Sequence, residues 1–95
     1  MTEAELERHL KSLGNRRRLS IINFLRKRKE ANVGEIAEAI KLSFTSTSKH
    51  LIILERVGFV EKEQKSLNMY YRLSSDAPRI LTSVLAMFEF ARISE

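Results

Sequence analysis

Residues 42–51 read LSFTSTSKHL, a run of hydroxyl side chains beside a lysine and a histidine. Serine and threonine form helix interiors poorly, because their side chains compete for backbone hydrogen bonds. The apolar spacing that follows nevertheless predicts a helix over residues 44–57, with Ser43 as its N-cap. Short polar side chains at the start of a helix let its backbone approach DNA and offer hydrogen bonds to phosphates and base edges. These residues therefore indicate a DNA contact.

This predicted helix has two faces when each residue is turned by about 100° around its axis. The inward face contains Thr47, Leu51 and Leu54. The outward face contains Thr45, Ser48, Lys49 and Ile52. A capping role alone explains Ser43, but it does not explain the four hydroxyl residues in succession from Thr45 to Ser48. We therefore expect the small, polar outward face to bind DNA.

Charge supports the same interpretation without deciding it. Seventeen lysines and arginines outweigh twelve acidic residues, which gives a net charge of +5 and a pI near 9.9. An excess of positive charge attracts polyanions, although it also serves plain solubility. Arg16 and Arg17 stand at a predicted helix start, where a cation opposes the helix dipole. They fit either a phosphate contact or a solvated face.

The titratable residues do not form a catalytic pattern. His50 has no nucleophile, paired carboxylate or second histidine at a useful spacing, so we expect it to make a polar contact on the helix flank. The chain has no cysteine, which excludes disulfides and thiolate metal sites. Its first residues, MTEAELERHL, do not resemble a signal peptide, and no apolar run reaches the roughly 20 residues of a membrane span. We therefore predict a cytoplasmic protein that is not an enzyme and has no membrane partner.

The length predicts one domain over residues 1–95. Capping residues and apolar spacing predict five helices, at 2–13, 15–29, 32–40, 44–57 and 77–93. The third and fourth are joined by a tight turn and form a helix-turn-helix. After Gly58 the period changes to two, which predicts a β-hairpin over 59–73 with its turn at Lys65 and Ser66. The predicted fold class is mainly α with a small β-hairpin, in the order α-α-α-α-β-β-α.

The last helix carries more apolar side chains than one small core can cover. We expect it to join two copies of the chain as helix 77–93, together with helix 2–13, because an exposed apolar patch of the size left on the last helix is unusual in a monomer. The residues predicted at this dimer interface are Leu6, Leu10, Leu81, Leu85 and Phe88. Two-fold symmetry then predicts a pseudopalindromic DNA operator.

Four motifs follow one another along the chain: LKSLGNRRRLSII, EIAEAIKLS, TSKHLIILERVGFVE and YYRLS. In sequence and spacing they resemble the ArsR/SmtB family of winged helix-turn-helix transcriptional regulators. The resemblance implies a dimeric repressor that binds double-stranded DNA, with helix 44–57 in the major groove and hairpin 59–73 as the wing. A winged-helix module for protein contact is the alternative, since it would keep the same core pattern without needing a small polar outward face.

Matched to the family's motif, the DNA-binding positions of this chain are Phe44, Thr45, Ser46, Ser48, Lys49 and His50, with Lys62 and Lys65 on the wing. Phe44 stands where the family commonly has glutamine, and it either contacts a thymine methyl group or packs under the turn. Glu61 and Glu63 lie where the family's wing is often basic, and Ser66 lies where it often has glycine. The resemblance therefore implies fewer phosphate contacts from this wing.

Metal sensing is the role that the resemblance first suggests, but the ligands are missing. The family's thiolate pair aligns with Asn32 and Gly34, and neither residue supplies a soft ligand. Glu89 is the only acidic residue between the ends of the last helix, which has no histidine. His9 and His50 lie on different elements without a partner at ligand spacing. We predict no metal and no cofactor; a signal, if one reaches the protein, comes from a small molecule, a protein partner or its own abundance.

Overall fold

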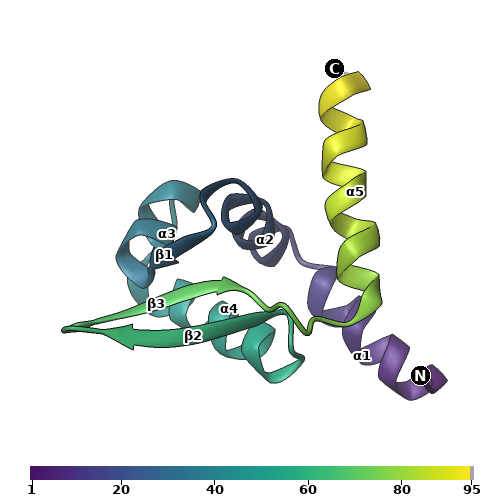
Figure 1. Cartoon of the computed structure of the whole chain (residues 1–95), viewed down its shortest axis with the longest axis horizontal. Helices are drawn as coiled ribbons and strands as arrows, with labels where there is room; N and C mark the ends of the chain where they lie inside the picture. The colour runs from purple at the N-terminus through teal and green to yellow at the C-terminus, as the bar shows by residue number, and fades with distance from the viewer. Residues whose placement is uncertain (95) are drawn as a thin grey trace.

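The computed structural model describes residues 1–94, with side chains as far as Phe90. Its elements are α1 (Glu3–Leu13), α2 (Arg16–Arg28), β1 (Glu30–Asn32), α3 (Val33–Ile40), α4 (Phe44–Arg56), β2 (Val60–Lys65), β3 (Asn68–Leu73) and α5 (Arg79–Ser94). In Figure 1 the hairpin of β2 and β3 lies against α4, whereas α5 extends away from these elements with α1 at its base. No helix in the described part of the chain is long and apolar enough to cross a membrane.

The first four helices begin at the capping residues that the sequence predicts. The side-chain oxygens of Thr2, Asn15, Asn32 and Ser43 each accept a hydrogen bond, at 2.8–3.1 Å, from the backbone N–H three residues on. The contact at Asn32 is reciprocal, because the Glu35 carboxylate accepts a hydrogen bond from the Asn32 N–H at 2.9 Å. These bonds satisfy donors that a helix start otherwise leaves free. They therefore fix where α3 and α4 begin.

The sheet has three strands, where the sequence predicts two. Their order is β1-β3-β2, and both neighbouring pairs are antiparallel. β1 is only three residues long and places Ala31 opposite Tyr71. So short a strand leaves no period of two to detect in the sequence. The hairpin turn lies at Ser66 and Leu67, one residue later than predicted, and Ser66 has a positive φ of 57°.

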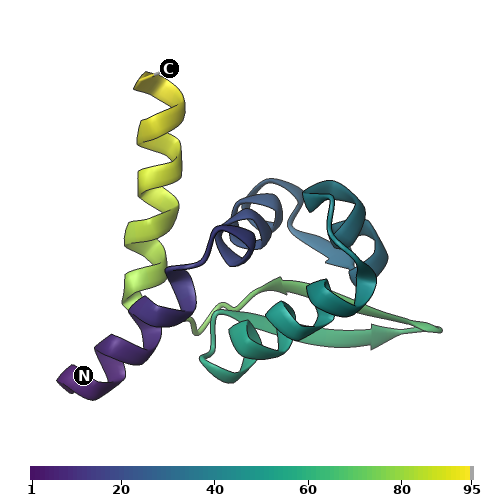
Figure 2. The ribbon, with the colours of Figure 1, turned by 180° about the vertical axis from the view of Figure 1, so that it is seen from behind.

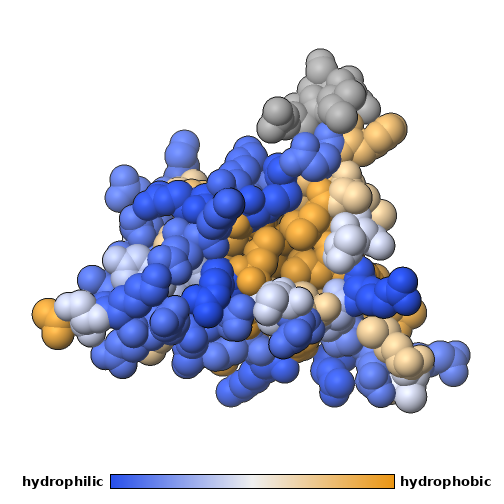
Figure 3. Space-filling view, viewed as in Figure 1, coloured by the Kyte–Doolittle hydropathy of each residue, from blue (hydrophilic) through white to orange (hydrophobic). Residues whose placement is uncertain are grey.

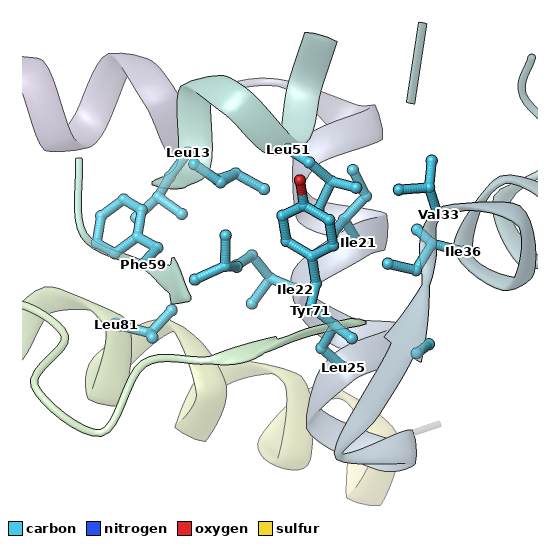
Figure 4. Close-up of a cluster of buried hydrophobic side chains, with 13 residues drawn as sticks. Leu13, Ile21, Ile22, Leu25, Val33, Ile36, Leu51, Phe59, Tyr71 and Leu81 are labelled. Atoms are coloured by element: carbon cyan, nitrogen blue, oxygen red, sulfur yellow. The ribbon is translucent and has the colours of Figure 1, made fainter. Parts of the chain in front are cut away.

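The core forms where α2, α3 and α4 meet the sheet and the first turns of α5 (Figure 4). Its largest fully buried side chains are Phe59, Ile21, Ile22, Leu25, Ile36, Leu51, Leu54 and Thr47. Burying one large apolar side chain contributes about 1.5–3 kcal/mol to stability. Three of these residues belong to α4, so the core fixes the rotation of that helix and the direction of its outward face.

Leu81 belongs to this core and not to the surface. Its side chain is 3% exposed within a single chain and lies below Phe59 in Figure 4. This burial corrects the prediction that Leu81 lies at a dimer interface, because an apolar helix pattern does not reveal which turns pack on their own chain. Further along α5, Glu89 forms an ion pair with Arg26 of α2. The Arg26 guanidinium also lies 5.9 Å from the ring centroid of Phe88.

Candidate nucleic-acid interface

The helix α4 presents the two faces that its sequence predicts. The fully buried face holds Thr47, Leu51 and Leu54. On the opposite side Thr45 and Lys49 are exposed and Ser48 is partly exposed. Within the described residues, no hydrogen bond or ion pair occupies these three side chains. Their hydroxyl and ammonium groups are therefore available to a ligand outside the chain.

Phe44 opens α4 and lies on the surface. Its side chain is 61% exposed. It borders a depression that is also lined by Gly34 at the start of α3 and by Leu67 and Asn68 at the tip of the hairpin. Of the two roles considered for Phe44, packing under the turn is not the one that the structure shows. The ring is accessible for an apolar contact such as one with a thymine methyl group.

Contacts on its two flanks place α4 between the hairpin and α2. Glu55 forms an ion pair with Lys62 of β2 at 3.4 Å. On the other flank, Nδ1 of His50 lies 3.3 Å from Nη1 of Arg18 in α2. Because Glu55 and His50 are five residues apart, their side chains are separated by about 140° around the helix. Figure 2 shows α4 running in front of the hairpin, with α2 and α3 above it.

Positive charges of the hairpin are paired within the chain. Nζ of Lys65 lies 2.7 Å from a carboxylate oxygen of Glu30 on β1, and this hydrogen bond raises the pKa of Lys65. Lys62 is paired with Glu55, as described above. Arg72 lies within 4.0 Å of three carboxylates, those of Glu30, Glu61 and Glu63. The phosphate contacts of Lys62 and Lys65 stay a prediction. A DNA phosphate would have to compete with the paired glutamate for each lysine.

His50 makes the flank contact that the sequence predicts, with an arginine as its partner. Burial lowers the pKa of His50, and the charges of Arg18 and Arg17 lower it further. The lowered pKa favours the neutral form of the imidazole. Arg18 also donates hydrogen bonds to the backbone oxygens of Ser12 and Lys11 at the end of α1. Spacing within one helix cannot reveal such a partner, because Arg18 lies on another element.

Sequence reasoning placed Arg16 and Arg17 without resolving their role, and it passed over Lys41. Nη1 of Arg17 donates a hydrogen bond to the carbonyl of Ile40 at 3.2 Å, which ties the start of α2 to the end of α3. Arg16 and Lys41 are exposed, and both line a second depression, which lies between α2 and the end of α3. For Arg16 and Arg17 the sequence holds one indication of a role, because two cations there oppose the dipole of α2. For Lys41 it holds none, since only folding brings Lys41 beside these arginines.

Comparison with known proteins identifies the family. A model of the bacterial regulatory proteins of the arsR family matches residues 15–62, just over half of the chain. The chain belongs to the ArsR family. This ArsR-family protein is also 38% identical over 80 residues to the transcriptional activator HlyU of Vibrio cholerae, a match that covers 84% of this chain and 68% of HlyU.

Solved structures confirm the winged helix-turn-helix fold of this ArsR-family protein. Reduced HlyU from Vibrio cholerae is 36% identical with a TM-score of 0.73, covering 92% of this chain and 84% of that one. A homodimeric winged helix-turn-helix DNA-binding domain from Mycobacterium bovis is 28% identical with a TM-score of 0.76, covering 97% and 82%. The transcriptional repressor BigR from Xylella fastidiosa is 27% identical with a TM-score of 0.76, covering 90% and 84%.

Family membership makes this ArsR-family chain a DNA-binding transcription regulator and not an enzyme, as the sequence predicts. The helices α3 and α4 are its helix-turn-helix, and β2 with β3 is its wing. Among residues 1–94, no three histidine, aspartate or glutamate side chains lie together in a group that could hold a metal ion. The absence of metal control stays a prediction.

Proposed function

We propose that this ArsR-family regulator inserts the start of α4 into the major groove of a specific DNA sequence. The residues assigned to base edges and phosphates are Phe44, Thr45, Ser46, Ser48 and Lys49, with His50 on the flank. The contrast between the two faces of α4 carries the proposal, because one face is fully buried and the other offers short polar side chains. Short side chains allow a close approach, and the positive end of the helix dipole attracts phosphate.

A homodimer joined by α1 and α5 is the second part of the proposal, with residues 1–95 forming one domain of each copy. Leu6 and Leu10 of α1 are exposed, as are Met87 (66%) and Phe90 (73%) of α5. Between the two helices lies an apolar groove of about 430 Å³, lined by Leu10, Leu13, Gly14, Leu19, Val84, Met87 and Phe88. Figure 3 shows apolar side chains, in orange, gathered beside α5 and next to a hydrophilic surface, in blue. A surface of this kind is usually covered in an oligomer.

Leu85 and Phe88 stay proposed members of this interface, although only part of each side chain is free to reach a second copy. Both are half-buried and pack against the core of their own chain. The homodimeric relative from Mycobacterium bovis supports the assembly. Two-fold symmetry of such a dimer gives a pseudopalindromic operator, with half-sites roughly 34–36 Å apart, one turn of DNA.

Repression is the direction of regulation that we propose, with the protein acting in the cytoplasm. A dimer that covers a promoter excludes other proteins by occupying the DNA, which requires no further binding surface. Among the relatives, BigR is named a repressor and HlyU an activator. A reporter gene with the operator across its promoter tests the direction. Expression should fall when the regulator is produced, and a rise would show activation instead.

Selection of duplexes from a random pool by the purified protein tests DNA recognition directly. We expect the selected sequences to share an inverted repeat. Ser48→Ala and Lys49→Ala should each weaken binding to that sequence by roughly 1–3 kcal/mol. Ser75→Ala and Arg79→Ala are matched controls, because both residues are exposed and lie outside α4. Unchanged affinity of the Ser48 and Lys49 variants, with the fold intact, would remove α4 from the interface.

A further inference from the structure

A depression lies between α2 and the end of α3, with a volume of about 650 Å³. Four cationic side chains line it, those of Arg16, Arg17, Lys27 and Lys41, together with the polar side chains of Ser20 and Asn23. We call it the basic groove. In Figure 2 α2 and α3 lie above α4. Lys41, which lines the basic groove, stands three residues before Phe44, where α4 begins.

The cations of the basic groove have no carboxylate beside them. Within the described residues, no ion pair involves Arg16, Arg17, Lys27 or Lys41. The first turn of α2 contains no acidic residue that would offset the two arginines. Four like charges around one depression repel each other, so a bound anion would be stabilised there. The hairpin is the reverse case, because Lys62, Lys65 and Arg72 each lie beside glutamates.

A side-chain hydrogen bond and a backbone turn set the position of the basic groove relative to α4. The hydrogen bond from Arg17 to the carbonyl of Ile40 holds α2 against the last turn of α3. Lys41 follows with a left-handed φ of 57° and precedes the N-cap Ser43 by two residues. The contact of Arg18 with His50 shows that α2 borders the flank of α4 turned away from Glu55 and the wing. The helix α2, which carries most of the residues of the basic groove, and the wing thus lie on opposite flanks of α4.

We propose that the basic groove binds the phosphate backbone of DNA on the side of α4 away from the wing. The inference rests on the proposed insertion of α4 into the major groove, since a helix in that groove has a phosphate strand on each side. The flank with unpaired cations is the one that can release counterions from those phosphates. In this regulator the main electrostatic contribution to binding therefore comes from α2 and the turn before α4, and the wing contributes less.

The test compares a groove variant with a control of equal charge. Arg16→Gln with Lys41→Gln removes two exposed cations of the basic groove, and Lys29→Gln with Arg79→Gln removes two exposed cations elsewhere. Binding to the selected operator is measured against salt concentration. The slope of log affinity against log salt is negative, and we expect it to become shallower by roughly one for each phosphate that the groove variant no longer neutralises. Affinity should fall by the same factor for operator and random duplex, because phosphate contacts carry no sequence information.

Equal slopes for the groove variant, the control variant and the wild type would overturn the inference while leaving the proposed function intact. A wild type that binds no duplex at all would instead overturn the proposed function. Equal melting temperatures of the variants show that folding does not cause the difference. A further arm titrates the wild type with inorganic phosphate and with a nucleoside triphosphate. Tight binding of either, abolished in the groove variant whose DNA slope is unchanged, would assign the basic groove to a free anion and overturn the inference.

Ethylation interference locates the contact on the DNA. Ethylating a phosphate removes its charge, so it blocks binding only where the protein uses that phosphate. For the wild type we expect blocked positions on both sides of each major-groove half-site. For Arg16→Gln with Lys41→Gln the positions on one side should no longer matter, and persistence of the full wild-type pattern would contradict the assignment.

Discussion

Nη1 of Arg18 lies 3.3 Å from Nδ1 of His50, which joins α2 to the recognition helix α4. The same guanidinium donates hydrogen bonds to the carbonyls of Ser12 and Lys11, the last turn of α1. One side chain therefore contacts both a helix of the proposed dimer interface and the helix that we propose inserts into DNA. Arg18 therefore links α1 and α4 through direct contacts on both sides.

Arg18→Met should lower the free energy of unfolding by about 1–3 kcal/mol. The reason is that the two carbonyls at the end of α1 lose a charged donor, and hydrogen bonds to charged groups contribute in that range. Urea denaturation measures the change. Arg16→Met serves as the control, since Arg16 is exposed and makes no side-chain hydrogen bond among the described residues. Equal stability of the two variants would show that the carbonyls of α1 do not depend on Arg18.

Stability should fall at mildly acidic pH because of His50. Burial and the neighbouring Arg18 and Arg17 lower the pKa of His50 in the folded protein. As pH falls, the unfolded chain therefore binds this proton first, beginning near its ordinary pKa of about 6.5. Stability is full above that pH and is lost as pH falls through the lower pKa of the folded state. His50→Gln keeps an acceptor for Arg18 and should reduce the difference in unfolding free energy between about pH 7.5 and about pH 5.5.

The prediction is contradicted if the unfolding free energy of His50→Gln depends on pH as strongly as that of the wild type. Other titratable groups would then cause the loss of stability at acidic pH. Titration of the imidazole proton signals of the wild type checks the direction independently, because the midpoint for His50 should lie below its ordinary value.

Removing the glutamates that are paired with the lysines of the wing should strengthen DNA binding. Glu55→Gln leaves Lys62 without its carboxylate, and Glu30→Gln does the same for Lys65. Each released lysine is then free to contact a phosphate, so affinity should rise and the salt dependence should steepen. Filter binding at several salt concentrations measures both. Glu38→Gln is the control, because Glu38 is exposed and changes the net charge equally; an equal gain in all three variants would show that net charge alone matters.

Met87→Asp should convert the dimer to monomers. Met87 lines the apolar groove between α1 and α5, and a carboxylate there would be desolvated on association. Leu67→Asp is the control, since Leu67 is exposed at the hairpin tip and belongs to neither α1 nor α5. Sedimentation at micromolar concentration should give dimers for the wild type and for Leu67→Asp. A monomeric wild type would defeat the proposed assembly.

Metal ions should not release this regulator from DNA. The chain has no cysteine, and the described residues contain no cluster of possible ligands. Soft metals bind thiolates in preference to the carboxylates and scattered imidazoles that are present. The measurement is a titration of the DNA complex with zinc, cadmium, copper and arsenite. Stoichiometric release at submicromolar concentration by any of them would reveal a site that the residue types do not suggest.

The parts of the fold that follow local rules could be predicted from the sequence. Capping at Thr2, Asn15, Asn32 and Ser43 gave the starts of four helices, because these side chains bond the backbone three residues on. The buried face of α4 followed from the 3.6-residue period at Thr47, Leu51 and Leu54. Local spacing suffices in such cases, since both partners lie on one element.

Features that depend on contacts between elements could not be predicted. The ion pair of Lys65 with Glu30 and the contact of Arg18 with His50 join residues far apart in the sequence. The sequence predicts Leu81 at the dimer interface because helix 77–93 is apolar on several sides. The fold instead buries Leu81 in the core of its own chain. Three residues of β1 likewise carry too short a pattern, so the strand is defined by its partner β3.

The pairing of β1 with β3 also orders events during protein synthesis. Glu30 pairs with Arg72, so β1 has no partner until nearly the whole hairpin has left the ribosome. Helices α2 to α4 are made first and form quickly, whereas long-range strand pairing is slow. A nascent chain that ends before Leu73 therefore holds its helix-turn-helix without the sheet that covers Leu25 and Leu51. For that interval the nascent chain exposes apolar surface that the finished sheet later covers, and it is then most prone to aggregate.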